Sequence, residues 1–165
     1  MFIVMTTKNI YETLKDLNID FKKYEHQPVI NVTEADAEYE KIGLEGTRCK
    51  NLFLRNAKGK KHFLFVTEAH KTANLQEIGE FLDERLSFAS PERLEKYLKT
   101  QRGSVSLLNL INDENHEVIL VLDREVAEAE KAGFHPDNND TTLMINNAEI
   151  HKFIEYCKNE VIVYR

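Results

Sequence analysis

Two residue pairs in this sequence have side chains suited to chemistry: Lys50 with Asn51, and His135 with Pro136. The ammonium group of a lysine beside a cleft can hold a phosphate or polarise a carbonyl group. Proline restricts the preceding residue to an extended backbone, which can aim the His135 imidazole into a cleft. The alternatives are one more surface lysine and a turn histidine bonded to local backbone. Residue type alone leaves both pairs of interpretations open.

Well-known catalytic signatures are absent, since the sequence has no GxSxG, HExxH, Walker or GxGxxG motif. Cys49 and Cys157 are too few for a disulfide framework and lack zinc-binding spacing. Basic neighbours could depress the pKa of the Cys49 thiol and make it a nucleophile, although strand alternation points it away from the Lys50 side chain. The remaining histidines lack the spacing of paired metal ligands, and we expect them at the surface or hydrogen-bonded in the core. They are His26, His62, His70, His116 and His151.

Composition predicts one soluble domain spanning residues 1–165, with 42% hydrophobic and 30% charged residues. No apolar run reaches the roughly 18–20 residues that a membrane span needs, and the N-terminus lacks the basic start of a secretory signal. With so few cysteines, we expect a cytoplasmic protein without membrane contact. A net charge of −6 argues against a general nucleic-acid binder.

The charge is nevertheless distributed unevenly along the chain. Residues 47–62 contain six basic side chains and no acid, whereas residues 112–130 contain seven acids and one arginine. A local basic face can hold one RNA end while the acidic remainder discourages indiscriminate binding. The alternative is a hairpin edge whose lysines prevent strand-to-strand aggregation.

The order of predicted elements indicates an α+β fold with a mixed, largely antiparallel sheet and peripheral helices. The clearest signal is a hairpin, with strands at 49–55 and 62–66 flanking turn residues 56–60. A second hairpin is expected from strands at 103–111 and 118–122. The other predicted strands cover 21–25, 141–145 and 161–164. Helices are expected at 7–17 with Thr7 as N-cap, from Thr33 to about 42, at 75–82, from the Ser90 N-cap to about 99, and from the Asn147 cap to about 156.

Four segments, in this order, resemble the YbaK-like prolyl-tRNA editing family, whose domain also occurs inserted in bacterial prolyl-tRNA synthetases. The resemblance spans nearly the whole chain. The segments are His26-Gln27-Pro28-Val29 with Thr33-Glu34-Ala35, Cys49-Lys50-Asn51-Leu52-Phe53-Leu54, Gly103-Ser104-Val105-Ser106 with Leu110-Ile111-Asn112-Asp113, and Gly133-Phe134-His135-Pro136 with Asn139 and Thr141-Thr142.

The resemblance implies a hydrolase that removes the wrong amino acid from tRNA(Pro) in trans. It is closest to the branch that acts on alanyl-tRNA(Pro), and it requires no metal or cofactor. The implied partners are the acceptor end of mischarged tRNA(Pro) and, transiently, prolyl-tRNA synthetase or an elongation factor.

The resemblance also implies roles for individual residues. Lys50 matches the essential lysine of the family, and His135 positions the substrate or handles a proton. Asn51 orients Lys50 or the adenosine. The backbone of the binding loop, residues Gly103, Ser104, Val105 and Ser106, holds the amino group and the ester. Val29 and Ile30 would form the pocket wall that measures the amino-acid side chain, with ordinary core packing as the alternative.

One stretch departs from the family pattern. Leu107, Leu108 and Asn109 stand where relatives commonly carry proline, a bulky apolar residue and glycine. This departure favours a second hypothesis, in which the protein is a noncatalytic tRNA-end or amino-acid binding or regulatory module on the same fold.

Overall fold

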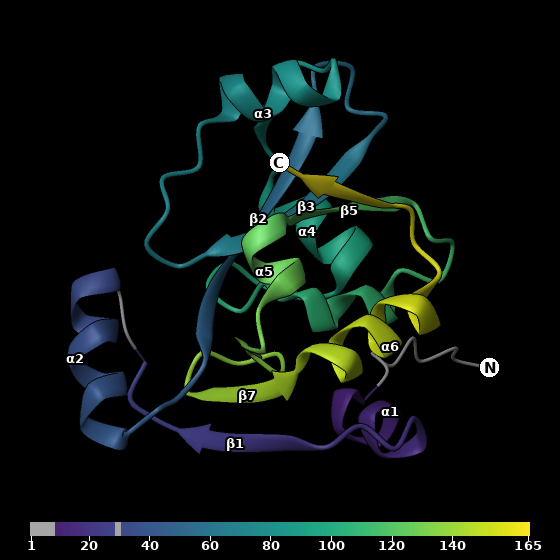
Figure 1. Cartoon of the computed structure of the whole chain (residues 1–165). Coiled ribbons are helices and arrows are strands. Elements are labelled where there is room, and N and C mark those ends of the chain that lie inside the picture. The colour runs from purple at the N-terminus through teal and green to yellow at the C-terminus, as the bar shows by residue number, and fades with distance from the viewer. Residues whose placement is uncertain (1–8, 29–30) are drawn as a thin grey trace.

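The computed structural model describes residues 9–28 and 31–165. Figure 1 shows helices arranged around a long central strand, β2. In chain order the elements are α1 (Ile10–Asp16), β1 (Phe21–Glu25), α2 (Val32–Ile42), β2 (Thr47–Asn56), β3 (His62–Glu68), α3 (Leu75–Leu82), β4 (Leu86–Phe88), α4 (Pro91–Leu98), the 3₁₀ helix η1 (Leu107–Asn112), β5 (Val118–Asp123), α5 (Arg124–Glu128), β6 (Lys131–Phe134), β7 (Thr141–Asn146), α6 (Asn147–Cys157) and β8 (Val161–Tyr164).

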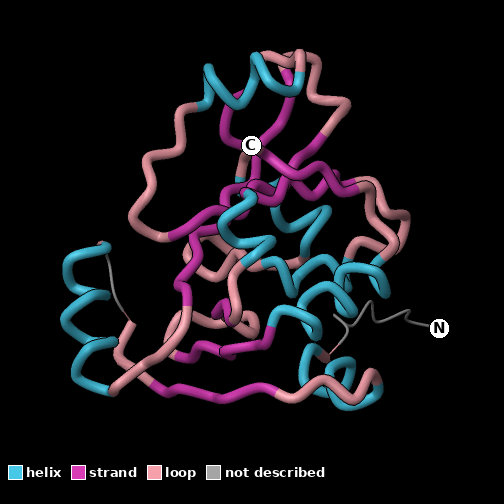
Figure 2. The backbone as a smooth tube through the Cα atoms, in the orientation of Figure 1, coloured by secondary structure: helices cyan, strands magenta, loops and turns pink. Residues whose placement is uncertain are grey.

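The strands form a mixed sheet in the order β1-β7-β6-β2-β3-β5-β8, with β4 also paired to β2. Within the described residues, four pairings are antiparallel (β1–β7, β6–β7, β2–β3 and β2–β4) and three are parallel (β2–β6, β3–β5 and β5–β8). In Figure 2 a lower group of strands and an upper group are joined by β2, which belongs to both. The expected α+β class with a largely antiparallel mixed sheet is confirmed.

Strand β2 positions the candidate site because one of its two edges is only partly covered. Strand β3 pairs with one edge without interruption from Cys49 to Arg55. The opposite edge pairs with β6 at Thr47 and Arg48, and with β4 from Leu54 to Asn56. Among the described strands, none pairs with this edge at residues 49–52, and at Phe53 the backbone carbonyl accepts a hydrogen bond from the N–H of Ala89. The sheet therefore has a gap beside the Lys50-Asn51 pair.

The two faces of β2 and β3 pack into different hydrophobic clusters. Phe53 belongs to a large cluster with Leu94 of α4, the leucines of η1 and Phe153 of α6. Its neighbour Leu54 belongs to a smaller cluster with Phe65 and with Ile78 of α3. This division follows from the alternation of side chains along a strand.

The hairpin at 49–66, the helix at 75–82, the Ser90-Pro91 helix start and the terminal strand at 161–164 are confirmed. Three helix starts were predicted wrongly. Helix α1 begins at Ile10 with Asn9 as its N-cap, and the predicted cap Thr7 lies outside the described residues. Helix α2 begins at Val32 with Asn31 as its N-cap, not Thr33. Helix α6 begins at Asn147 itself, because the Asn147 side chain bonds the carbonyls of Ala127 and Ala129 instead of capping.

The expected second hairpin is wrong. Residues 107–112 form a 3₁₀ helix, and β5 pairs in parallel with β3 and β8. The leucine-rich run of η1 is buried on every side, so its apolar pattern has no period that separates strand from helix. A capping box between Ser106 and Asn109 starts the 3₁₀ helix. Strands β4 and β6 and helix α5 were not predicted, and each contains five residues or fewer.

Candidate active site

A cavity of about 440 Å³ lies at the uncovered edge of β2. Its walls come from four segments: β2, the β4–α4 connection, the loop before η1, and the residue after β6. The lining residues are Cys49, Lys50, Asn51, Leu52, Phe53, Phe88, Ala89, Pro91, Leu94, Arg102, Gly103, Val105 and His135. The cavity volume falls within the ~300–1,000 Å³ range typical of small-molecule sites.

Lys50 and Asn51 point to opposite faces of β2, because the pairing with β3 continues without a bulge through both residues. Both nevertheless line the cavity. The reason is the gap in the sheet, which leaves an edge of β2 accessible from both of its faces. Lys50 as a residue is half-buried, and its ammonium group donates a hydrogen bond to the backbone carbonyl of Lys71.

Asn51 connects β2 to the opposite wall of the cavity. Its side-chain oxygen accepts a hydrogen bond from the backbone N–H of Leu107, at 2.9 Å. Leu107 is the first residue of η1 and directly follows the Gly103–Ser106 loop. Asn51 thus fixes the end of this loop against the strand that carries Lys50.

The predicted binding loop is divided between the cavity and the core. Gly103 and Val105 line the cavity, and Gly103 has a φ of +92°, a conformation that side-chain-bearing residues rarely adopt. Ser106 is fully buried, and its hydroxyl accepts a hydrogen bond from the N–H of Leu108. Ser104 and Ser106 are not among the residues that line this cavity. The loop therefore offers the cavity mainly backbone and an apolar side chain.

His135 lies at the end of the cavity closest to β7. Its Nδ1 lies 2.9 Å from the carbonyl oxygen of Thr141, which can only accept, so Nδ1 carries the proton and Nε2 the lone pair in the neutral ring. Burial lowers the pKa of His135 below its ordinary value. Nearby, the His26 ring lies 6.1 Å from the His135 ring and contacts Thr142 Oγ1 through Nε2, at 2.8 Å. His135 is therefore a neutral proton acceptor held by its backbone partner.

The possibility of a cysteine nucleophile is not supported. Burial raises the pKa of the Cys49 thiol to about 12. The thiol is consequently protonated at neutral pH and is a poor nucleophile. Cys49 contributes to the cavity as a small wall residue.

A network of charged groups fixes helix α2 beside the site. Arg48 forms an ion pair with Asp36 of α2 and lies over the ring of Tyr39. His70 contacts both Asp36, at 2.9 Å, and Glu68, at 2.6 Å. Hydrogen bonds to Glu68 and Asp36 raise the pKa of His70. Arg48 and Tyr39 also line a smaller cavity of about 210 Å³ between α2 and β2, which shares Cys49, Lys50, Asn51 and His135 with the first.

The structure brings together Lys50, Asn51, Gly103, Val105 and His135 as predicted site residues. Val29 and Ile30, the predicted pocket wall, lie outside the described residues. Phe88 and Arg102 are among the cavity residues that were not predicted. Neither belongs to a recognisable motif, and Phe88 lies on a strand of only three residues. No group of three potential metal ligands is found in residues 9–28 and 31–165.

The charge of the cavity is opposite in sign to that of the protein. Its lining includes Lys50, Arg102 and His135 and contains no aspartate or glutamate. The chain as a whole has a net charge of −6. A cavity of this kind favours an anionic or carbonyl-bearing ligand and excludes cations. It combines a cation, a neutral imidazole and backbone groups around one space, the donor set expected for ester or phosphate chemistry.

The fold and the site match a known class of domain, the aminoacyl-tRNA editing domain. The aminoacyl-tRNA editing domain family matches residues 29–153. This match covers more than half of the chain, so the protein belongs to the aminoacyl-tRNA editing domain family, and the expected resemblance is confirmed.

Individual relatives point in the same direction. The prolyl-tRNA editing protein ProX of Acetoanaerobium sticklandii is 35% identical over 145 residues, which cover 86% of each chain. Prolyl-tRNA synthetase associated domain-containing protein 1 of Mus musculus is 28% identical over 157 residues, covering 92% of this chain and 91% of that one. The solved structure of a candidate trans-editing enzyme for prolyl-tRNA synthetase has a TM-score of 0.70 at 15% identity and covers 98% of both chains. This last likeness concerns the fold alone.

Proposed function

We propose that the protein hydrolyses the ester bond of mischarged aminoacyl-tRNA(Pro), with alanyl-tRNA(Pro) as its substrate. Family membership and the similarity to ProX support the editing of prolyl-tRNA. The observation that carries the proposal is the carboxylate-free cavity at the open edge of β2, where Lys50, Asn51 and His135 meet.

The need for such an enzyme follows from the limits of binding selectivity. A synthetase pocket built for proline cannot exclude a smaller amino acid by sterics, because a missing methylene changes binding by only ~1–3 kcal/mol. A second site must then admit alanine and reject proline. We assign this size filter to Val29 and Ile30, as predicted from the sequence.

In the proposed reaction, water attacks the carbonyl carbon of the ester that joins alanine to the terminal ribose. The Lys50 ammonium and backbone N–H groups of the Gly103–Val105 loop stabilise the negative charge that develops on the carbonyl oxygen. His135 Nε2 accepts a hydrogen bond from the attacking water or the substrate amino group. The C–O ester bond then breaks, the ribose oxygen leaves with a proton as a hydroxyl group, and free alanine is released. A neighbouring ribose hydroxyl can assist the proton transfer.

The ester is already reactive, so this site needs no serine or cysteine nucleophile. The proposed reaction takes place wherever charged tRNA is found, which we expect to be the cytoplasm. Prolyl-tRNA synthetase and an elongation factor are the transient partners that this role implies. No described helix is long and apolar enough to cross a membrane.

Deacylation of alanyl-, cysteinyl-, seryl- and prolyl-tRNA(Pro) tests the proposal, with the ester remaining as the readout. We expect rapid loss of the alanyl ester and no acceleration for prolyl-tRNA(Pro). If the protein binds the tRNA end but accelerates none of the four reactions, the alternative of a noncatalytic binding module is correct. The departure of Leu107, Leu108 and Asn109 from the family pattern is the feature that motivates this alternative.

A further inference from the structure

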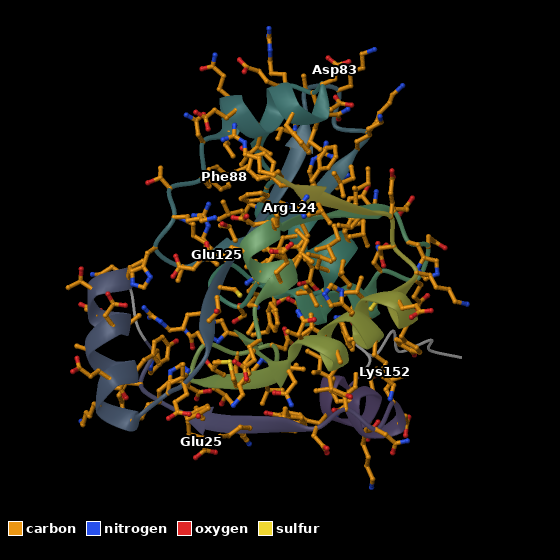
Figure 3. The ribbon with its side chains drawn as sticks, in the orientation of Figure 1. Glu25, Asp83, Phe88, Arg124, Glu125 and Lys152 are labelled. Atoms are coloured by element: carbon orange, nitrogen blue, oxygen red, sulfur yellow. The ribbon has the colours of Figure 1, made fainter. Side chains whose placement is uncertain are left out.

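Phe88 stands out among the large apolar residues of the described chain. It has 59% of its surface exposed, more than any other large hydrophobic side chain described. It lies on β4, close to α3, as labelled in Figure 3. Phe88 also lines the cavity, so its exposed ring is available for a flat apolar group to stack on.

The backbone on both sides of Phe88 is fixed. Phe88 pairs with Leu54 of β2, and the next residue, Ala89, donates its N–H to the carbonyl of Phe53 at 3.0 Å. Ser90 then caps α4 through the N–H of Arg93, at 3.2 Å. The exposed ring is therefore attached to a backbone that hydrogen bonds hold in place. This limits the conformational entropy that the protein loses when a ligand stacks on the ring.

The cavity is chemically divided along β2. Lys50, Asn51 and His135 form a polar end, whereas Phe88 and the apolar residues Leu52, Phe53, Pro91 and Leu94 line the remainder. Cross-strand partners share a face, so Phe88 lies on the same face of β2 as Lys50. Lys50 and Leu54, the partner of Phe88, lie four positions apart in β2, which corresponds to about 13 Å along the strand. A ligand that fills this space has one polar, reactive end and one flat apolar end.

We propose that Phe88 is the platform on which the adenine base of the terminal tRNA nucleotide stacks while the ester lies beside Lys50. This inference rests on the proposed function and adds to it the recognition of the nucleobase. Arg102, which lines the same cavity, provides a positive charge for the phosphate of that nucleotide. The absence of carboxylates among the lining residues suits a nucleotide and disfavours a basic peptide.

Fluorescence anisotropy with two short acceptor-stem RNAs tests this platform. One RNA ends in an intact 3′-terminal adenosine, and the other carries an abasic ribose at that position. Wild-type protein should bind the intact RNA more tightly. Phe88→Ala should weaken its binding about tenfold or more, since base stacking on an aromatic ring is worth that much, and should bind both RNAs equally. Phe88→Trp should retain the preference for the intact RNA.

Phe81→Ala is the matched control, because Phe81 is 47% exposed on α3 and does not line the cavity. This variant should bind both RNAs as wild type does. In deacylation of alanyl-tRNA(Pro), Phe88→Ala should raise KM and leave kcat near the wild-type value. Thermal melts of both variants identify any general loss of folding.

Each other outcome contradicts one specific claim. If Phe88→Ala keeps the wild-type preference for the intact RNA, or weakens both RNAs by the same factor, the adenine platform is wrong. If wild type deacylates alanyl-tRNA(Pro) and Phe88→Ala does so with the same KM, only the platform fails. If wild type neither deacylates the substrate nor binds either RNA, the proposed function itself fails.

Discussion

The side-chain oxygen of Asn51 accepts a hydrogen bond from the backbone N–H of Leu107, so that β2 and η1 are held together beside the cavity. Removal of this acceptor in Asn51→Ala leaves a partly buried N–H unsatisfied. We expect a loss of about 1–3 kcal/mol in the free energy of unfolding. Displacement of the Gly103–Val105 loop should also reduce deacylation by about 10–100-fold.

Asn51→Asp is the control for this prediction, because a carboxylate keeps an acceptor for the Leu107 N–H. Chemical denaturation should place its free energy of unfolding near that of wild type. An alanine variant with wild-type stability and wild-type activity would show that the hydrogen bond has no positioning role.

His135 should make the reaction sensitive to acid. Burial lowers the pKa of its imidazole below 6.5, so the ring is neutral at pH 7 and remains neutral until the pH falls below 6.5. Protonation then removes the acceptor at Nε2. The ratio of the wild-type rate to that of His135→Gln should be constant above pH 6.5 and should decrease below it. A ratio that stays constant from pH 7 down to the lowest pH at which both proteins remain folded would remove His135 from the proton-accepting role.

His62 should make stability decrease in acid independently of activity. The His62 residue is only 1% exposed, and its ring stacks on Phe53. Its Nε2 lies 2.9 Å from Nη1 of Arg93. Burial is the larger cause and the Arg93 charge the next, and they lower the pKa of His62 to about 4. Below pH 6.5 the unfolded chain takes up a proton that the folded chain does not bind until about pH 4. The unfolded state is therefore favoured as the pH falls through this range, by up to about 3 kcal/mol.

Urea denaturation of wild type and His62→Gln at pH 7, 5.5 and 4 measures this contribution. Several carboxylates also lose stabilising contacts in acid, but their contribution is common to both proteins and cancels in the difference. The difference in the free energy of unfolding should become more favourable to the variant as the pH falls. Parallel pH dependences would contradict the assignment to His62.

The hairpin lysines should govern the salt dependence of RNA binding. Lys58 and Lys60 are exposed at the β2–β3 turn, whereas Lys61 is paired with Glu84 at 3.3 Å. The double variant Lys58→Glu/Lys60→Glu should reduce the slope of log affinity against log salt by about one to two. Lys152→Glu, on the exposed face of α6 in Figure 3, is the control and should leave the slope unchanged. An unchanged slope in the double variant would leave the hairpin only its role against aggregation.

The sequence predicts those parts of the fold that local chemistry determines. The turn at residues 56–60 and the Ser90-Pro91 helix start depend on residues close together in the chain. The gap beside β2 depends instead on pairing with β6, about 85 residues later, and with the three-residue β4. No local pattern contains that information. The family resemblance predicted Lys50, Asn51 and His135 as site residues. They share a cavity because the pairing of β2 with β6 ends at Arg48 and its pairing with β4 begins only at Leu54.

Phe88 is a cavity residue that the sequence alone does not predict. In the sequence it is one of nine phenylalanines, and it gives no sign that its ring is exposed. Its exposure results from the pairing of β4 with the end of β2 and from the start of α4 immediately afterwards. Only the assembled sheet separates Phe88 from core residues such as Phe53.

The most direct test of the account is the deacylation of alanyl-tRNA(Pro) by Lys50→Ala, with Lys152→Ala on the exposed face of α6 as a matched lysine control outside the cavity. Lys50 is half-buried at the cavity and contributes charge instead of core packing, so the melting temperature should change little. Loss of a cation that stabilises the developing oxyanion should lower kcat/KM by about 10²–10³-fold, while Lys152→Ala stays near wild type. Turnover near the wild-type rate in a folded Lys50→Ala protein would contradict the central role of Lys50.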